Sequence, residues 1–298
     1  MRIFPILFIL FIFIGSSLKA QVSESANWAT RLTSQYRVIP DVTYSVANNY
    51  ECKLDVYARR GDPAPTLIYI HGGGWVAGTK NNAIMGIMPF LEMGFSVVNV
   101  GYRLARVSPA PAAVEDCRMA LRWVHKNAKE YGFDTTRIVI TGGSAGGHLA
   151  LMTGMLNPEA GFDAPKEWDQ VSMNLPTAAI INFYGITDVA DLLSGVNRQQ
   201  YAVSWIGSQE NGVSVAKRVS PLTYVRKELP PIFTIHGDRD QLVPYSHAVR
   251  LHEALAKAGV QNALLTIPGG RHGGFTNDEM TKIFATIREF LTKTGVLK

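Results

Sequence analysis

One stretch near the middle of the chain constrains the fold more than any other. Residues 138–150 read Ile-Val-Ile-Thr-Gly-Gly-Ser-Ala-Gly-Gly-His-Leu-Ala, so a β-branched apolar run ends abruptly in glycines and small residues follow. This pattern predicts a strand, a sharp turn and a helix, with Ser144 at the apex of the turn. Only glycines fit beside such an apex, because a Cβ there would collide with the strand or the helix. The turn would hold the Ser144 hydroxyl clear of the sheet, at the positive end of the next helix.

Strand and helix patterns alternate on both sides of this stretch. An antiparallel pair is expected over 38–44 and 50–57, after a polar segment, 21–36, that is either an ordered arm or a short helix. Further strands are expected at 66–70, 95–100, 137–141, 178–184, 231–235 and 263–267, and helices at 81–92, 111–131, 145–155, 244–258 and 277–293, the last capped by Asn277. Such alternation requires crossover connections and gives a mostly parallel sheet with helices on both faces. We therefore expect an α/β fold with about eight strands, built as one domain over 21–298.

The alternation stops over residues 185–228. No strand pattern occurs there, and only 187–193 and 200–206 have weak helical patterns. An insertion of this kind in an α/β sheet usually covers something. We interpret it as a small lid.

The first twenty residues predict an export signal. A basic start, Met1-Arg2, precedes twelve apolar residues over 3–14 and a small and polar stretch over 15–20, after which cleavage is expected. Twelve apolar residues are too few to span a bilayer comfortably. We therefore expect a protein exported to the periplasm or secreted, with no stable membrane insertion after cleavage; an uncleaved anchor is the alternative.

The charge distribution and the two cysteines bear on which partners, disulfides and metal sites to expect. The formal net charge is +5, or +3 without Arg2 and Lys19 of the expected leader, and it is spread along the chain with no basic run. This distribution does not favour nucleic acid as a partner. Cys52 falls in a strand pattern and Cys117 in a helix pattern. Export would permit a disulfide, but two separate buried thiols are the favoured interpretation, and two cysteines have no metal-site spacing.

Four of the predicted strands end in polar or glycine-rich loops. These loops contain His71, Ser144, Asp240 and His272. Ligands of parallel α/β sheets bind beyond the carboxyl ends of the strands, so the loops should meet at one edge. A serine becomes nucleophilic when a histidine takes its proton and a carboxylate fixes the histidine tautomer. Ser144, an acid and His272 follow the chain order expected for such a triad, although the sequence by itself leaves Asp238 and Asp240 as alternatives for the acid.

The remaining histidines are assigned structural or surface roles. His125, His247 and His252 fall on helix patterns and are expected to be solvated. His148 should pack or hydrogen-bond locally behind Ser144. His236 is expected to be structural at a strand end.

The loop 71–75, His-Gly-Gly-Gly-Trp, matches an HGGG-type element that supplies oxyanion donors. Its glycines let the backbone approach a substrate carbonyl with no Cβ in the way. We expect the backbone N–H groups of Gly73, Gly74 and Ala145 to form the oxyanion hole. Trp75 either walls the adjoining pocket or packs in the core.

Four segments together carry a resemblance to a known family. They are 71–75 (HGGGW), 100–105 (VGYRLA), 142–147 (GGSAGG) and 236–244 (HGDRDQLVP). Over about residues 37–295 the chain resembles hormone-sensitive-lipase-like bacterial carboxylesterases of the α/β-hydrolase fold. It is closest to the branch that includes feruloyl and acetyl esterases of carbohydrate-degrading bacteria, and it is similar to kynurenine formamidases.

The resemblance implies further assignments. In that family the acid is the second aspartate of H-G-x-x-D-x-x-V-P, which corresponds to Asp240 here. The acidic residue of the long second helix corresponds to Asp116, which we interpret as structural. The chain departs from the family at 102–106, Tyr-Arg-Leu-Ala-Arg, where many relatives continue Ala-Pro-Glu.

Together these features predict a serine hydrolase that cleaves carboxylic esters through an acyl-enzyme, with no metal or cofactor. Export and resemblance favour small acyl esters of carbohydrates, acetyl or feruloyl, outside the cytoplasm. The alternatives are an amidase or formamidase, a general short-chain carboxylesterase, and a non-catalytic binding protein on the same fold. The oligomeric state does not follow from the sequence.

Overall fold

The computed structural model describes residues 23–163 and 175–298, so the expected leader, 1–20, lies outside the described residues. Residues up to Ser34 form a unit of their own, of which the described part is nearly all of helix α1 (Glu24–Gln35), one of the two forms expected for this polar segment. The second unit, 35–298, contains the sheet and all the candidate site residues.

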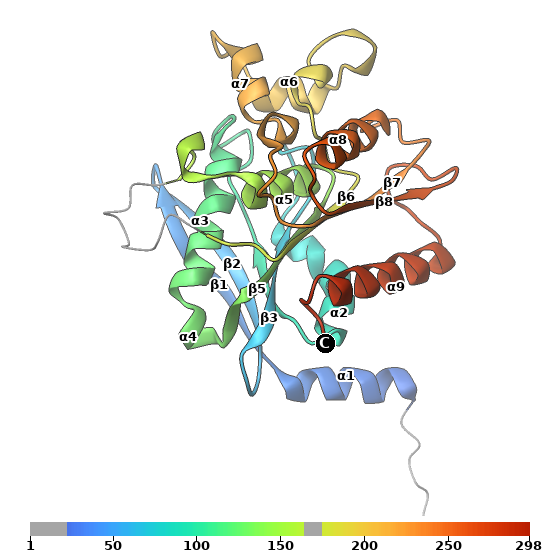
Figure 1. Cartoon of the computed structure of the whole chain (residues 1–298). Coiled ribbons are helices and arrows are strands. Elements are labelled where there is room, and N and C mark those ends of the chain that lie inside the picture. Colours follow the sequence, from blue (N-terminus) through green and yellow to red (C-terminus); the bar gives the residue numbers. More distant parts are fainter. Residues whose placement is uncertain (1–22, 164–174) are drawn as a thin grey trace, which may run out of the picture. The chain divides into compact units, whose positions relative to one another are not determined.

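In the part of the chain that the structure describes, eight strands form one sheet in the order β1-β2-β4-β3-β5-β6-β7-β8 (Figure 1). β1 pairs antiparallel with β2, and β2 with β4, whereas each pair from β4 to β8 is parallel. This confirms the mostly parallel sheet. The strands are β1 (Tyr36–Ala47), β2 (Tyr50–Arg59), β3 (Ala64–Ile70), β4 (Ser96–Val100), β5 (Phe133–Gly143), β6 (Ala179–Phe183), β7 (Ile232–Gly237) and β8 (Asn262–Ile267).

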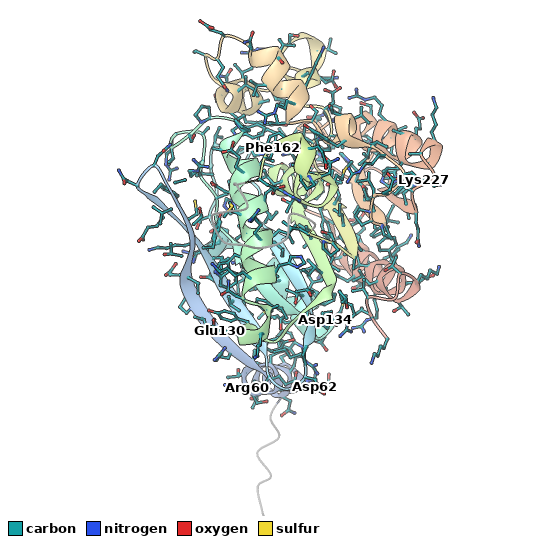
Figure 2. All side chains as sticks on the ribbon, turned by 60° about the vertical axis from the view of Figure 1, so that its left-hand side comes forward. Arg60, Asp62, Glu130, Asp134, Phe162 and Lys227 are labelled. Carbon is teal, nitrogen blue, oxygen red and sulfur yellow. The ribbon has the colours of Figure 1, made fainter. Side chains whose placement is uncertain are left out.

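Helices cover both faces of the sheet (Figure 1). On one face α2 and α9 meet through Phe90 and Phe284, whose ring centroids lie 5.8 Å apart. The other face carries α3, α5 and α8, and Figure 2 shows α3 lying along β5. The helices are α2 (Ile84–Glu92) after the 3₁₀ turn η1 (Lys80–Ala83), α3 (Ala112–Lys126), α4 (Ala128–Tyr131), α5 (Ala145–Met155) followed by η2 (Pro158–Ala160), α8 (Ser246–Lys257) and α9 (Asn277–Lys293).

Two helix ends differ from the prediction. The single helix expected over 111–131 is interrupted at Asn127, whose amide folds back to donate to the carbonyl of Trp123. The predicted cap of α9 at Asn277 is wrong. The cap is Thr276, which exchanges two hydrogen bonds with Glu279 in a capping box, so a T-x-x-E pattern sets this helix start.

The insertion over 185–228, described throughout, contains no strand, as expected. Its elements are η4 (Ala190–Leu192), η5 (Gly195–Asn197), α6 (Gln200–Ile206), α7 (Gly212–Arg218) and η6 (Pro221–Tyr224). The helix predicted over 200–206 is present, whereas the pattern at 187–193 yields only a 3₁₀ turn and α7 was not predicted. In both overall views α6 and α7 lie beyond one end of the sheet (Figures 1 and 2).

The apolar core takes in both cysteines. Cys52 of β2 and Cys117 of α3 are buried and free, as predicted, and burial raises the pKa of the Cys52 thiol to about 12. Within residues 23–163 and 175–298, no helix combines the length and apolar character needed to cross a bilayer.

Two buried histidines fasten the two ends of the insertion to the helical layer. At the first end, His247 of α8 accepts a hydrogen bond at Nδ1 from the backbone N–H of Thr187, at 3.1 Å. At the second end, His148 of α5 donates from Nε2 to the carbonyl of Val219, at 2.6 Å. The expectation that His247 and His252 are solvated is therefore wrong: both are buried, because the helix face that carries them packs inward.

Burial keeps both anchoring histidines neutral. It lowers the pKa of His148 to about 3, and together with the nearby positive charge of Arg250 it lowers that of His247 to about 4. Each Nδ1 already faces an N–H donor, the Trp75 indole in one case and the Thr187 amide in the other. A proton added at Nδ1 would therefore meet another donor instead of an acceptor.

Acidification from pH 7 to pH 5 should weaken the fold through these histidines. Their folded pKa values lie below the value of about 6.5 in an unfolded chain, so the unfolded state takes up protons first and the free energy of unfolding falls as the pH falls below 6.5. The loss by pH 5 should be about 2 kcal/mol for His247. A His247→Gln variant keeps a donor and an acceptor without titrating, so urea unfolding should show it losing less stability over this range than the unaltered protein. An equal loss in both proteins would contradict the assignment.

Candidate active site

Ser144 stands where β5 ends and α5 begins, as predicted. Its backbone has φ 59° and ψ −122°, a conformation that costs free energy for any residue with a Cβ and that concentrates at functional sites. A hydrogen bond to the neighbouring strand helps to keep Ser144 in this conformation. The Ser144 N–H donates to the carbonyl of Phe183 at the end of β6, at 2.9 Å.

Glycines allow this turn to pack directly against β3. A Cβ on either Gly142 or Gly146 would overlap the carbonyl oxygen of Ile70, the last residue of β3. A Cβ on Gly72 would lie 2.7 Å from the carbonyl oxygen of Gly143. The close approach brings the loop after β3 beside Ser144.

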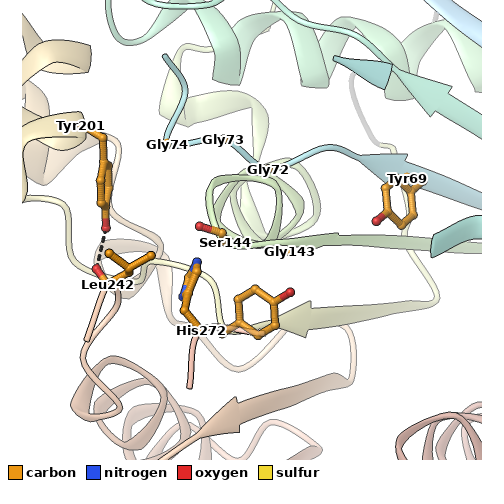
Figure 3. Close-up of a pocket in the computed structure, with 10 residues that line it drawn as sticks. Tyr69, Gly72, Gly73, Gly74, Gly143, Ser144, Tyr201, Leu242 and His272 are labelled. Carbon is orange, nitrogen blue, oxygen red and sulfur yellow. Dashed lines mark hydrogen bonds between the residues drawn. The ribbon is translucent and has the colours of Figure 1, made fainter. Parts of the chain in front are cut away.

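That loop turns back on itself through three consecutive residues with positive φ. Gly73 and Gly74 have φ 118° and 59°, and Trp75 has φ 60°. The glycines line the same pocket as Ser144, with their backbone facing it (Figure 3). Ala145, the first residue of α5, has one of the N–H groups that a helix start leaves without an intrahelical partner. Gly73 and Gly74 thus line the pocket that Ser144 lines, and Ala145 follows Ser144 directly at the start of α5.

Trp75 anchors this loop in the core and does not wall a pocket. Its indole is fully buried, stacks on Trp205 of α6 with ring centroids 4.0 Å apart, and donates from Nε1 to His148 Nδ1 at 3.2 Å. His71 is held by stacking on Tyr102, whose hydroxyl donates to the His71 carbonyl at 3.1 Å. The loop is therefore positioned by packing against the insertion as well as by β3.

His272 lines the pocket with Ser144, although 128 positions separate them in the sequence (Figure 3). Its Nδ1 lies 2.7 Å from Oδ2 of Asp240, so Nδ1 carries the proton and donates to the carboxylate. This leaves Nε2 as the basic nitrogen. The ring of Tyr184 packs against the imidazole, with centroids 4.7 Å apart.

Asp240 is held by donors on both of its oxygens. Oδ1 accepts from the backbone N–H groups of Leu242 and Val243 at 2.8 and 2.9 Å, and Oδ2 lies 3.2 Å from Nε2 of His236 as well as close to His272. Burial by itself raises the pKa of Asp240, but the hydrogen bonds from His236, His272 and Val243 outweigh it and hold the pKa well below its usual range. The carboxylate is therefore ionised.

Asp238 serves a different purpose. Its Oδ1 accepts from the backbone N–H of Gly269 at 2.6 Å and so braces the loop that leads to His272. Of the two candidate acids, only Asp240 contacts the imidazole in the structure.

The pocket is also lined by three tyrosines, none of which was indicated by a sequence motif. Tyr69 comes from β3, Tyr184 follows β6 with φ 40°, and Tyr201 comes from α6 of the insertion. The Tyr201 hydroxyl donates to the carbonyl of Leu242 at 2.8 Å, and a Cβ on Gly74 would lie 2.8 Å from Tyr201 Cβ. Tyr201 therefore connects the loop 71–75 to the loop that carries Asp240, and through Tyr201 the insertion contacts the pocket.

Two neighbouring pockets share part of their lining. The cleft over Ser144 has a volume of about 480 Å³, and an adjoining lobe of about 280 Å³ shares Tyr69, Gly143 and Tyr184 with it. The rest of the lobe is mostly apolar and is lined by Gly86, Phe183, Gly273, Gly274, Phe275, Met280 and Phe284. Burial raises the pKa of Tyr184 to about 12, so its hydroxyl is a neutral donor between the two pockets.

Asp116 lies away from this pocket, in a buried ion pair that fits the structural interpretation. Its carboxylate accepts from the backbone N–H of Arg103 at 2.8 Å and from the guanidinium Nε at 2.9 Å. Arg103 belongs to the segment 102–106 that departs from the family pattern. Among the described residues, no three histidine, cysteine, aspartate or glutamate side chains form a group that could hold a metal ion.

Known proteins share both the sequence pattern and this architecture. The family model described as BD-FAE matches residues 54–255. Esterase LipQ of Mycobacterium tuberculosis is 29% identical over 244 residues, which cover 78% of this chain and 56% of LipQ, and esterase LipC of the same organism is 30% identical over 74% of this chain and 56% of its own length. The chain thus spans about half the length of the curated relatives it matches.

Two of the similar solved structures match this chain along nearly their whole length. The apo form of Thermogutta terrifontis esterase 2 has a TM-score of 0.73 and 28% identity, covering 89% of this chain and 96% of that one. A truncated carbohydrate esterase from gut microbiota has a TM-score of 0.71 and 27% identity, covering 85% and 96%. The sheet order and these neighbours establish the α/β-hydrolase fold.

Because the Ser144 turn packs closely on β3, replacing one of its glycines by alanine should lower the stability of the fold considerably. Gly146→Ala should lower the free energy of unfolding by about 3 kcal/mol, because the new Cβ overlaps the Ile70 carbonyl and neither backbone segment can give way. Gly259→Ala is the matched control, since Gly259 has φ 74° and open space around it, so that only about 1 kcal/mol of backbone strain is expected. Urea unfolding of the two variants would contradict this account if their losses were equal.

Proposed function

The chain belongs to the BD-FAE family, and on that premise we propose that it cleaves carboxylic esters with Ser144 as the nucleophile. The observation that carries the proposal is the shared pocket. Ser144, in its strained turn, and His272, hydrogen-bonded to Asp240, line one cleft beside a glycine loop. The named esterases among the relatives support the same reaction class.

In the proposed mechanism Ser144 Oγ attacks the ester carbonyl while His272 Nε2 takes the hydroxyl proton. Asp240, ionised and fixed on both oxygens, stabilises the imidazolium that forms. The backbone N–H groups of Gly73, Gly74 and Ala145 stabilise the oxyanion, which develops only in the transition state. His272 then protonates the leaving alcohol, and a water molecule activated by the same imidazole hydrolyses the acyl-enzyme.

The substrates we propose are acetyl or feruloyl esters of carbohydrates, met outside the cytoplasm. The expected leader supports the location, and the likeness to a carbohydrate esterase from gut microbiota supports the alcohol part. The adjoining lobe of about 280 Å³, lined by Phe183, Phe275 and Phe284, offers space for a flat acyl group such as feruloyl, whereas an acetyl group needs only the cleft.

Three substitutions should separate the roles of the acidic and nucleophilic residues. Ser144→Ala should lower kcat by roughly 10⁴-fold or more, and Asp240→Asn by roughly 10³–10⁴-fold, because an amide does not stabilise the imidazolium or fix its tautomer. Asp238→Asn is the matched control: its amide oxygen still accepts from Gly269, so kcat should remain near that of the unaltered protein. Undiminished ester turnover in Ser144→Ala would refute the nucleophile assignment.

A substrate panel tests the acyl and alcohol groups. Rates of acetate or ferulate release from carbohydrate esters should exceed those from simple butyryl and octanoyl esters of matched alcohols. Hydrolysis of only the simple esters would leave a general carboxylesterase, and faster cleavage of N-formylkynurenine than of an ester of similar size would identify a formamidase. These measurements use the unaltered chain, with Ser144→Ala as the blank.

A further inference from the structure

We propose that His236 is a positioning residue for Asp240, holding the carboxylate from within the sheet while His272 binds it from the cleft. His236 lies on β7, four residues before Asp240, and its side chain is fully buried. Its Nε2 lies 3.2 Å from Asp240 Oδ2, the same oxygen that His272 Nδ1 contacts at 2.7 Å. The inference rests on the proposed function in so far as Asp240 is the acid of the triad.

The contacts of His236 define its tautomer. Nε2 also lies 3.0 Å from the carbonyl oxygen of Val243, so both of its neighbours accept hydrogen bonds and Nε2 carries the proton. Nδ1 is buried without a hydrogen-bond partner among the described residues. A second proton there would be an unsatisfied buried donor, which costs roughly 1–3 kcal/mol or more. His236 is therefore a neutral donor.

With this donor, four groups donate hydrogen bonds to the Asp240 carboxylate. The backbone N–H groups of Leu242 and Val243 occupy Oδ1, and the two imidazoles share Oδ2. Because His236 also donates to the Val243 carbonyl, it ties the acid to the turn that supplies those N–H groups. Rotation of the carboxylate away from His272 would break several of these bonds at once.

The shared oxygen also has an electrostatic consequence. Each hydrogen bond to a carboxylate spreads its charge, so the donor from His236 reduces the stabilisation that Asp240 can give to the His272 imidazolium. Without it, Asp240 would hold a proton on His272 more strongly. The phenols of Tyr184 after β6 and Tyr245 ahead of α8 pack against His236, and that of Tyr201 on α6 interacts electrostatically with Asp240.

Two variants of matched size isolate the donor. His236→Met removes it and fills the space with an apolar chain, whereas His236→Gln has nearly the same volume and keeps an N–H group within reach of Asp240. If the Met variant does not fold, His236→Asn replaces it, since the shorter Asn amide reaches only the place of Nδ1. Thermal unfolding of all variants identifies those that fold.

The decisive readout is the pKa of His272, measured by NMR titration of the histidine-labelled full chain. In the Met variant this pKa should rise by about half a unit or more, and the acidic limb of kcat/KM should move to higher pH by the same amount. We also expect kcat to fall roughly tenfold, with Gln restoring both quantities toward those of the unaltered protein. A purely structural role for His236 would lower stability without moving the titration.

Two results would overturn the proposal. One is a His272 titration that is the same in the Met and Gln variants. The other is a His236 nitrogen spectrum showing the proton on Nδ1 instead of Nε2. Both measurements are made on the resting protein and need no turnover, so they remain informative even if Ser144→Ala shows that the proposed esterase function is wrong.

Discussion

The site depends on the close approach between the Ser144 turn and the carboxyl end of β3. No side chain fits between Gly142 or Gly146 and the Ile70 carbonyl, so the two segments touch backbone to backbone. The contact brings the glycine loop that follows β3 to the start of α5, beside Ser144, where the proposed mechanism places the oxyanion. It also transmits the rigidity of a central parallel strand to a residue with strained φ and ψ.

The insertion contributes to the site by holding two loops at a fixed separation. Its two ends are fastened to the helical layer by His247 and His148, and Trp205 stacks on Trp75 of the oxyanion loop. Tyr201 then spans from Gly74 to the carbonyl of Leu242, next to the turn that grips Asp240. Through these contacts the insertion connects the loop 71–75 to the loop that carries Asp240.

Much of this architecture follows from local patterns. Strand periodicity, the glycine turn and the chain order of a serine, an acid and a histidine were enough to predict the sheet and the edge where the loops meet. The choice of Asp240 over Asp238 needed the family resemblance as well. The glycines beside Ser144 can be recognised in the sequence because backbone contact admits only one residue type. The pocket tyrosines could not be predicted, because Tyr184 and Tyr201 reach the site through tertiary packing and neither stands in a motif. The capping box at Thr276 could have been predicted from the sequence but was missed.

The histidines show why residue type alone did not determine role. His148 and His247 each face an N–H donor at Nδ1, so both are locked as neutral acceptors and serve as structural anchors. His272 faces a carboxylate at Nδ1, so it must donate there, which leaves Nε2 free as a base toward the cleft. His236 presents Nε2 to the same carboxylate and has an unpartnered Nδ1, so it can only donate. For His148, His247 and His272 the group opposite Nδ1 decides the role, and in each case that group comes from a different element of the fold.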